Sequence, residues 1–244
     1  MIKNKKSQSH LEILLSFVIF IGFLIFLLIF FNPFKKMGNE QTYLNLLQQS
    51  IEKELKKEII IYSIKLNESY EGCYNFEIKD DDNLRNKNLT KKDLNNTIYD
   101  SMHTIKENNY VIYSNFSSQI DFYYIYFSED FLENNLDGNN CNRKIDKKNY
   151  TLGMLRSYYS ISFKYLNETF KKEYETNYSK LKDRIGLPQT KNFAIDFYNL
   201  ERTNKIISLG NTPEKAVVYS RTIPEQIFYP NGTFEYIFMQ IKVW

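Results

Sequence analysis

The stretch EQTYLNLLQQSIEKELKKEIIIYSIKL, residues 40 to 66, changes its hydrophobic period half-way along. Its first part repeats apolar residues every three or four positions, which predicts a helix near residues 40–56. From Ile59 to Leu66 the apolar and β-branched residues suit a strand, so we expect the helix to run into a strand without a loop. The helical positions are Tyr43, Leu46, Leu47, Ile51 and Leu55.

Before this stretch lies an uncharged apolar run, Ile13 to Phe31. Nineteen residues that rise about 1.5 Å each span about 28 Å, close to the hydrocarbon thickness of a bilayer. The run therefore predicts one transmembrane helix, and a buried helix of a water-soluble core is the alternative. It is too long for the apolar region of a secretory signal peptide. More lysines precede it than follow it, which favours a single-pass cell-membrane protein with its carboxyl-terminal domain outside.

Three features stand in order at the start of the chain: Lys5 and Lys6, then Gln8, then Glu12 at the edge of the apolar run. This order resembles the class III signal peptide of archaeal type IV pilin-like proteins. The resemblance covers about 27 of the 244 residues, and Ser9-His10 departs from the usual serine placement. It implies that a prepilin-type peptidase cuts between Ser7 and Gln8 and leaves the apolar helix on the mature chain.

Under this resemblance Glu12 has a role in assembly. Cutting before Gln8 creates a charged amine four residues from Glu12, and a carboxylate at the edge of an apolar region is costly unless it is paired. The resemblance implies that the amine of a neighbouring subunit supplies the partner. The alternative is that Glu12 lies among lipid headgroups near Lys5 and Lys6.

The formal net charge of +3 belongs to the proposed leader, residues 1–7. Removing it deletes three lysines, so 32 basic residues become 29 and equal the 29 acidic ones. A nucleic-acid partner requires a surplus of basic side chains to neutralise phosphates. We therefore expect no nucleic acid among the partners, which would be the lipid bilayer, the prepilin-type peptidase and identical or related pilin-like subunits.

Two features agree with an external location. Cys73 and Cys141 are the only cysteines and have no CxxC partner, so a disulfide between them is permitted, with two buried free thiols as the alternative. The chain also holds eight Asn-x-Ser/Thr triplets, where its 27 Asn and 29 Ser plus Thr predict roughly three by chance. The candidate N-glycosylation sites outside predicted helix are Asn67, Asn88, Asn95, Asn115, Asn149 and Asn231.

The part beyond residue 66 is expected to be an antiparallel β-rich α+β domain with one long amphipathic helix at about 163–185. Residues 79–108 and 129–149 are polar and are expected to be loops. An Asn-Gly turn within 229–233 predicts a terminal hairpin. Its last strand should place Ile237, Met239, Ile241 and Val243 on one face. The other candidate strands are 73–78, 109–116, 120–127, 150–162, 192–198 and 217–222.

No enzyme motif is present in the sequence. The eight glycines are scattered, and no P-loop, HExxH or GxSxG occurs. His103 is the only histidine after the apolar run, and a lone histidine in a polar stretch is ordinarily a surface residue. The segment Asp80-Asp81-Asp82-Asn83 could hold calcium through its oxygen atoms but lacks EF-hand spacing, and a solvated acidic turn is the alternative. We expect no catalytic residues, no cofactor and no metal.

The expected organisation is a leader at 1–7, a transmembrane helix at 8–33, an amphipathic helix and first strand at 34–66 and an extracellular α+β domain at 67–244. The expected function is that of a membrane-anchored pilin-like subunit or accessory subunit at the cell surface. The alternative is an unprocessed, membrane-tethered binding or adhesion module that does not polymerise. The sequence names no ligand.

Overall fold

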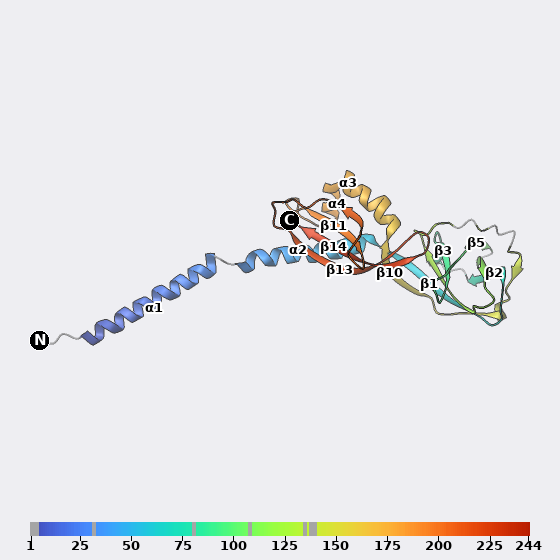
Figure 1. Ribbon diagram of the computed structural model, residues 1–244, viewed down its shortest axis with the longest axis horizontal. Helices are drawn as coiled ribbons and strands as arrows, with labels where there is room; N and C mark the ends of the chain where they lie inside the picture. Colours follow the sequence, from blue (N-terminus) through green and yellow to red (C-terminus); the bar gives the residue numbers. More distant parts are fainter. Residues whose placement is uncertain (1–4, 31–32, 80–81, 107–108, 134–135, 137–140) are drawn as a thin grey trace.

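The computed structural model describes the backbone of residues 5–30, 33–79, 82–106, 109–133, 136 and 141–244. Side chains are described for residues 14–27, 40–79, 83–106, 109–133, 136 and 141–244. The chain is mostly β-sheet, with 44% of its residues in strands and 27% in helices. Helix α1 (Lys5–Phe30) projects from one end of a globular part, and β2 and β5 lie at the opposite end (Figure 1).

The junction between α2 (Pro33–Leu55) and β1 (Lys56–Leu66) joins the two halves of the globular part. The strand begins at the residue after the helix ends, so the expected loop-free junction is confirmed. Leu47, Ile51 and Leu55 lie on one face of α2 and are fully buried. Because these side chains repeat at helical spacing, α2 covers a sheet with its apolar face.

The larger sheet has ten strands in the order β12-β11-β14-β13-β10-β1-β7-β3-β4, with β9 also paired to β1. Most pairs are antiparallel, but β10 pairs with β13 in parallel. The pairing partner of β1 changes along its length, from β10 near its start to β7 and β9 near its end. The other strands are β3 (Asn88–Asp93), β4 (Ile98–Tyr99), β7 (Phe122–Ser128), β9 (Tyr150–Leu152), β10 (Arg156–Ser162), β11 (Phe193–Asn199), β12 (Lys205–Leu209), β13 (Tyr219–Phe228) and β14 (Phe234–Val243).

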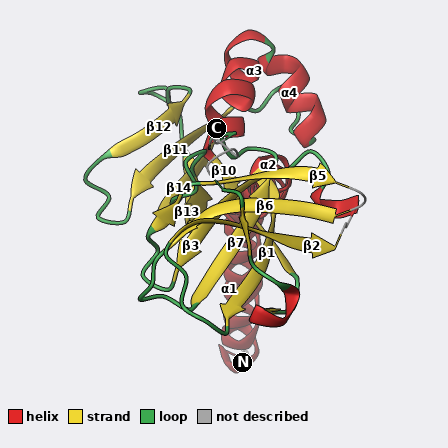
Figure 2. Ribbon diagram, turned by 90° about the vertical axis from the view of Figure 1, so that its right-hand side faces the viewer, coloured by secondary structure: helices red, strands yellow, loops and turns green. Residues whose placement is uncertain are grey.

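A second sheet of four strands, in the order β5-β6-β2-β8, crosses the face of β1, β7 and β3 (Figure 2). Between the two sheets lies an aromatic and aliphatic core that includes Ile60, Ile64, Phe76, Ile112 and Phe127. A separate core lies where the helices cover β10 to β14. The strands of the second sheet are β2 (Gly72–Lys79), β5 (Ser101–Lys106), β6 (Asn109–Phe116) and β8 (Arg143–Lys144).

The terminal hairpin is confirmed. Strands β13 and β14 pair from Phe228↔Phe234 out to Tyr219↔Val243, and Gly232 in the turn has φ 86°, a value that glycine adopts without strain. The four apolar side chains expected on one face of β14 are all fully buried. Alternation with a period of two therefore locks the carboxyl-terminal strand into the sheet.

The expected long amphipathic helix at 163–185 is wrong. This segment contains a π-helical turn η4 (Tyr165–Phe170), α3 (Lys171–Thr176) and α4 (Tyr178–Ile185). The chain breaks at Asn177, whose φ of −135° and ψ of 38° are not helical. Asparagine is a weak helix former, because its side chain can bond to nearby backbone groups in non-helical conformations. The hydroxyls of Tyr174 and Tyr178, on either side of the break, both donate to the Phe193 carbonyl of β11. These bonds hold the two short helices on the sheet.

The expected transmembrane helix at 8–33 is also contradicted. In the part of the chain that the structure describes, no helix combines the length and the apolar character that a bilayer crossing requires. The structure therefore does not support the expected single-pass anchor or its placement at the cell membrane, and both expectations are corrected.

The α+β class is corrected for a second reason, because the polar region 79–108 is not a loop. It contains η1 (Asp82–Leu84), β3, β4 and β5. The region 129–149 contains the short β8 and η3 (Lys147–Asn149). These segments lack apolar alternation in sequence, and they form strands because neighbouring strands supply hydrogen bonds and burial, a tertiary effect that outweighs β propensity.

Asp196 on β11 ties the edge of the large sheet together. Its buried carboxylate accepts hydrogen bonds from Lys242 (2.7 Å) and Ser208 (2.6 Å) and lies 2.9 Å from the Lys205 ammonium. Burial by itself would raise the pKa of this carboxyl, but the bond from Lys242 and the other contacts lower it below 3.8. The carboxylate therefore contributes stability above pH 4 that is lost as the pH falls through the lowered pKa.

We expect Asp196→Asn to reduce the free energy of unfolding at pH 7 by about 2–3 kcal/mol, because two lysines lose a buried anionic partner. The difference from the unsubstituted protein should shrink below pH 4, where the aspartate itself becomes protonated. Urea unfolding at pH 7 and pH 3 measures both effects, with the exposed Asp121→Asn as control. Equal stability of Asp196→Asn and Asp121→Asn at pH 7 would contradict this role.

Candidate functional site

The described part of α1 presents an apolar surface on every side. Its large apolar side chains between Leu14 and Phe26 are 37–64% exposed. Successive residues of a helix are about 100° apart, so the consecutive run Phe17 to Ile21 points in all directions around the axis. A helix that is apolar all round is ordinarily buried. This part of α1 therefore needs a cover that surrounds it.

The residues of the expected leader cut and assembly contact lie at the start of this helix. The backbone of Ser7, Gln8 and Glu12 belongs to α1, while their side chains lie outside the described residues. The acidic residues 80–82 likewise have no described side chains.

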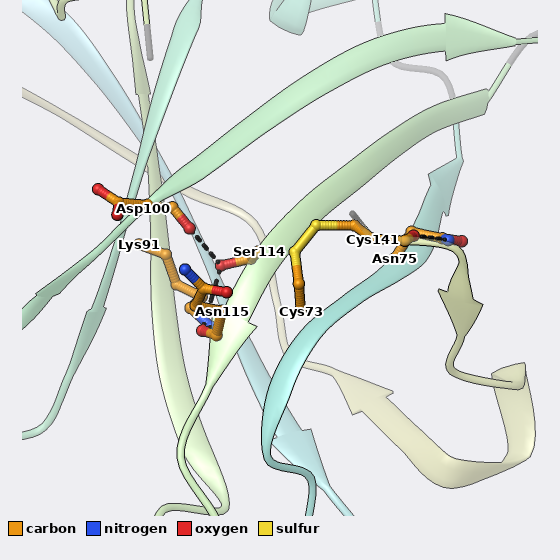
Figure 3. Close-up of a disulfide and its surroundings, with 7 residues drawn as sticks. All are labelled: Cys73, Asn75, Lys91, Asp100, Ser114, Asn115 and Cys141. Carbon is orange, nitrogen blue, oxygen red and sulfur yellow. Dashed lines mark hydrogen bonds between the residues drawn. A yellow bond between two sulfur atoms is a disulfide. The ribbon is translucent and has the colours of Figure 1, made fainter. Parts of the chain in front are cut away.

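The two cysteines are joined in the structure. Cys73 at the start of β2 and Cys141 form a disulfide that closes a loop of 68 residues (Figure 3). In the chain-entropy model such a loop contributes about 4 kcal/mol by restricting the unfolded chain. Asn75 donates to the Cys141 carbonyl at 2.8 Å and so holds the same segment against β2.

Lys91 of β3 extends into the core between the two sheets. Its ammonium group is fully buried, lies 3.5 Å from the Phe116 ring centre and 4.1 Å from that of Tyr123, and donates to the Asn115 carbonyl (Figure 3). Burial lowers the pKa of Lys91 well below 10.5. Burial therefore makes the charged form of this group less favourable than it is in water.

Lys92, the next residue of β3, points to the other face of the large sheet. That face carries Tyr126 of β7 and Tyr158 of β10, because Lys92 pairs with Tyr124 and strand positions alternate. The tip of the β13–β14 hairpin closes over it, with the Phe234 ring centre 5.3 Å from that of Tyr126. Together these elements surround a pocket of about 330 Å³. The lining residues are Lys92, Asn96, Tyr126, Tyr158, Gln226, Thr233, Phe234 and Tyr236.

The hairpin tip approaches the sheet so closely that only glycine fits. A Cβ atom at Gly232 would lie 2.6 Å from Thr90 Oγ1 and 2.9 Å from Thr90 Cβ. The positive φ of Gly232 disfavours any other side chain as well. The Asn-Gly turn predicted from the sequence therefore also determines how closely the hairpin residues that line the pocket approach the sheet.

Burial shifts the pKa values of three ionisable side chains that line the pocket. Burial lowers the pKa of Lys92 to about 8 and raises the pKa values of Tyr126 and Tyr158. At pH 7 the lysine is therefore mostly charged and both tyrosines remain protonated. Perturbed groups that converge on a pocket of this size mark a candidate binding site.

The six candidate glycosylation sites differ in accessibility. Asn67, Asn95 and Asn231 are exposed, whereas Asn88, Asn115 and Asn149 are half-buried. The Asn88 amide donates to the Phe131 carbonyl at 2.9 Å, and the Asn149 amide donates to Glu68. The exposed sites on the β3–β4 and β13–β14 turns are the best placed acceptors.

His103 lies on β5 and not in the expected loop. It is half-buried, 5.5 Å from the Tyr110 ring centre, and burial lowers its pKa, while Glu133 acts in the opposite direction. The described residues contain no group of three or more His, Cys, Asp or Glu side chains placed to hold a metal ion.

Sequence reasoning missed Lys91 and Lys92 as functional candidates. The segment Asn88–Asp93 reads as polar and was expected to be loop, so nothing in it indicated that two adjacent lysines would be buried on opposite faces of one strand. The sequence offered one indirect indication. The aromatic-rich strand 122–128 needs a pairing strand on the side that β1 does not occupy, and β3 is that strand.

Comparisons of the chain with protein-family models, with curated proteins and with solved structures found no match.

We expect Lys91→Met to raise the free energy of unfolding by about 1–3 kcal/mol at pH 7, because it removes a desolvated amine and keeps the apolar stem. This advantage should shrink as the pH rises towards 9. Burial lowers the pKa of Lys91 in the folded state, so as the pH rises the folded chain loses this proton before the unfolded chain does, and the unsubstituted protein gains at most about 1.4 kcal/mol per pH unit.

Chemical denaturation of both proteins between pH 7 and 9 measures this slope, with the exposed Lys65→Met as control. A stability difference that does not change with pH would show that Lys91 keeps its proton in the folded state.

Proposed function

We propose that this chain is a pilin-like subunit or accessory subunit that assembles with identical or related chains through α1. The observation that carries the proposal is the apolar surface on all sides of α1. A groove on a partner covers one face of a helix, whereas a bundle of like helices covers each member on several sides. Complete burial of one Leu, Ile or Phe contributes about 1.5–3 kcal/mol, so a few such contacts suffice for association.

The position of α1 supports this mode of assembly. The helix projects away from both sheets, so helices from several copies could bundle while the globular parts remain outside the bundle (Figure 1). The order Lys5, Lys6, Gln8 and Glu12 before the apolar run supports the removal of a leader by a prepilin-type peptidase. In this proposal the new amine at Gln8 of one subunit pairs with Glu12 of its neighbour and sets the stagger between helices.

The leader is tested by mass spectrometry of the amino-terminal peptide of protein isolated from its native source. We expect a mature chain that begins at Gln8. A chain that still begins at Met1 in assembled material would contradict leader removal and the pairing of a new amine with Glu12.

Assembly is tested with Phe20→Glu, which places a charge in the middle of the proposed bundle. Because an unpaired buried carboxylate is strongly unfavourable, we expect at least a tenfold loss of sedimentable assemblies, with the globular fold unchanged by circular dichroism. Met154→Glu is the matched control, since Met154 is an exposed apolar residue, 81% accessible, outside α1. Equal assembly of the two variants would remove α1 from the mechanism.

A further inference from the structure

The pocket next to Lys92 is built from segments far apart in the sequence. Its floor is the sheet face with Tyr126 and Tyr158, and its roof is the hairpin with Phe234 and Tyr236. The rings of Tyr126, Tyr158 and Phe234 pack against a small buried cluster that contains Ile59 and Phe228, so the aromatic walls are held in place. Its volume of about 330 Å³ is within the range of small-ligand sites.

Lys92 differs from the other buried lysines. Four lysines are buried in the described part of the chain, and three of them donate a hydrogen bond: Lys87 to Glu58, Lys91 to the Asn115 carbonyl and Lys182 to the Gln189 carbonyl. Lys92 is 3% exposed, and its ammonium group has no hydrogen bond or ion pair to any described residue. Its ammonium group lies 4.3 Å from the Phe234 ring centre and 5.5 Å from that of Tyr126.

An ammonium group in this position would gain from an anionic partner. The faces of aromatic rings stabilise an ammonium group only weakly where water can reach it. A carboxylate in a partly desolvated pocket stabilises the same group more strongly, because the two form a charge-assisted hydrogen bond. The protein supplies one cation to the pocket, which matches a ligand with one negative charge. A phosphate group calls for several donors, such as an arginine fork or a helix terminus, and the lining has neither.

The remaining groups of the pocket fit a hydroxylated ring. Aromatic faces can stack on the apolar C–H face of a pyranose, while hydroxyls and amides bind the hydroxyls at its edge. The phenols of Tyr126 and Tyr158 are protonated donors at neutral pH. The side chains of Asn96 and Gln226 add amide groups at the rim.

From this geometry we infer that the pocket between β3, β7, β10 and the β13–β14 hairpin binds a saccharide unit that carries a carboxylate, with Lys92 as the partner of the carboxylate and the four aromatic rings as stacking surfaces. This site is separate from α1, so the inference does not depend on assembly.

The test is a titration of the purified full chain with D-glucuronate, followed by the tyrosine ring signals in NMR, with methyl glucoside as the neutral probe. We expect saturable binding with a dissociation constant on the order of 1 mM, typical of a ligand of this size. Methyl glucoside should bind at least about tenfold more weakly, because it cannot pair with Lys92.

Two pairs of variants make the test specific. Lys92→Met and Tyr236→Ala should each weaken glucuronate binding about tenfold or more; Tyr236 is 62% exposed, so its replacement does not endanger the fold. The controls are Lys57→Met, a lysine 3.6 Å from the Tyr165 ring centre and outside this pocket, and Tyr159→Ala, the exposed neighbour of Tyr158. Both controls should bind as the unsubstituted chain does.

Three results would overturn the inference. These are no saturable change with glucuronate at tens of millimolar, equal affinity for the neutral glucoside, and an equal loss of binding in the control variants. Unchanged binding in Tyr236→Ala together with Lys92→Met would place the ligand elsewhere on the chain.

Discussion

The pairing of β1 with different partners along its length is the constraint on which the rest of the structure depends. Near its start β1 pairs with β10 and continues α2, so it belongs to the helix-covered half of the large sheet. Near its end it pairs with β7 and β9 and packs under the second sheet. Both cores are therefore attached to one strand, whose backbone hydrogen bonds hold the two halves in a defined register.

This arrangement also explains why two adjacent lysines acquire different environments. β3 pairs with β7, and β7 pairs with β1, so successive residues of β3 alternate between the inter-sheet core and the opposite face. Lys91 faces the core and donates to a backbone carbonyl. Lys92 faces a pocket that the terminal hairpin roofs, and its charge is left for a ligand. One strand thus places one lysine in the core between the sheets and the next lysine at the proposed ligand site.

The two proposed functions use separate parts of the molecule. α1 carries an apolar surface and no described cavity, whereas the pocket lies on the globular part, away from the helix. A subunit that assembles through one end and binds a ligand at another can present many weak sites at once. A dissociation constant near 1 mM for a single site would then suffice, because linked sites raise the effective concentration of ligand.

The features predicted correctly from the sequence are those specified by nearby residues. The α2–β1 junction follows from a change of period within 27 residues, and the terminal hairpin follows from Asn231-Gly232 and the alternation after it. The sequence did not predict the strands in 79–108, the break at Asn177 or the pocket. It predicted a membrane-spanning helix, and no helix in the described residues meets that requirement. Burial of Lys91 and Lys92 depends on β7, the second sheet and the hairpin, none of which is adjacent to these lysines in the sequence. Local pattern sets the period of a segment, but only the folded chain determines which neighbours remove its side chains from water and which of its charges are left without a partner.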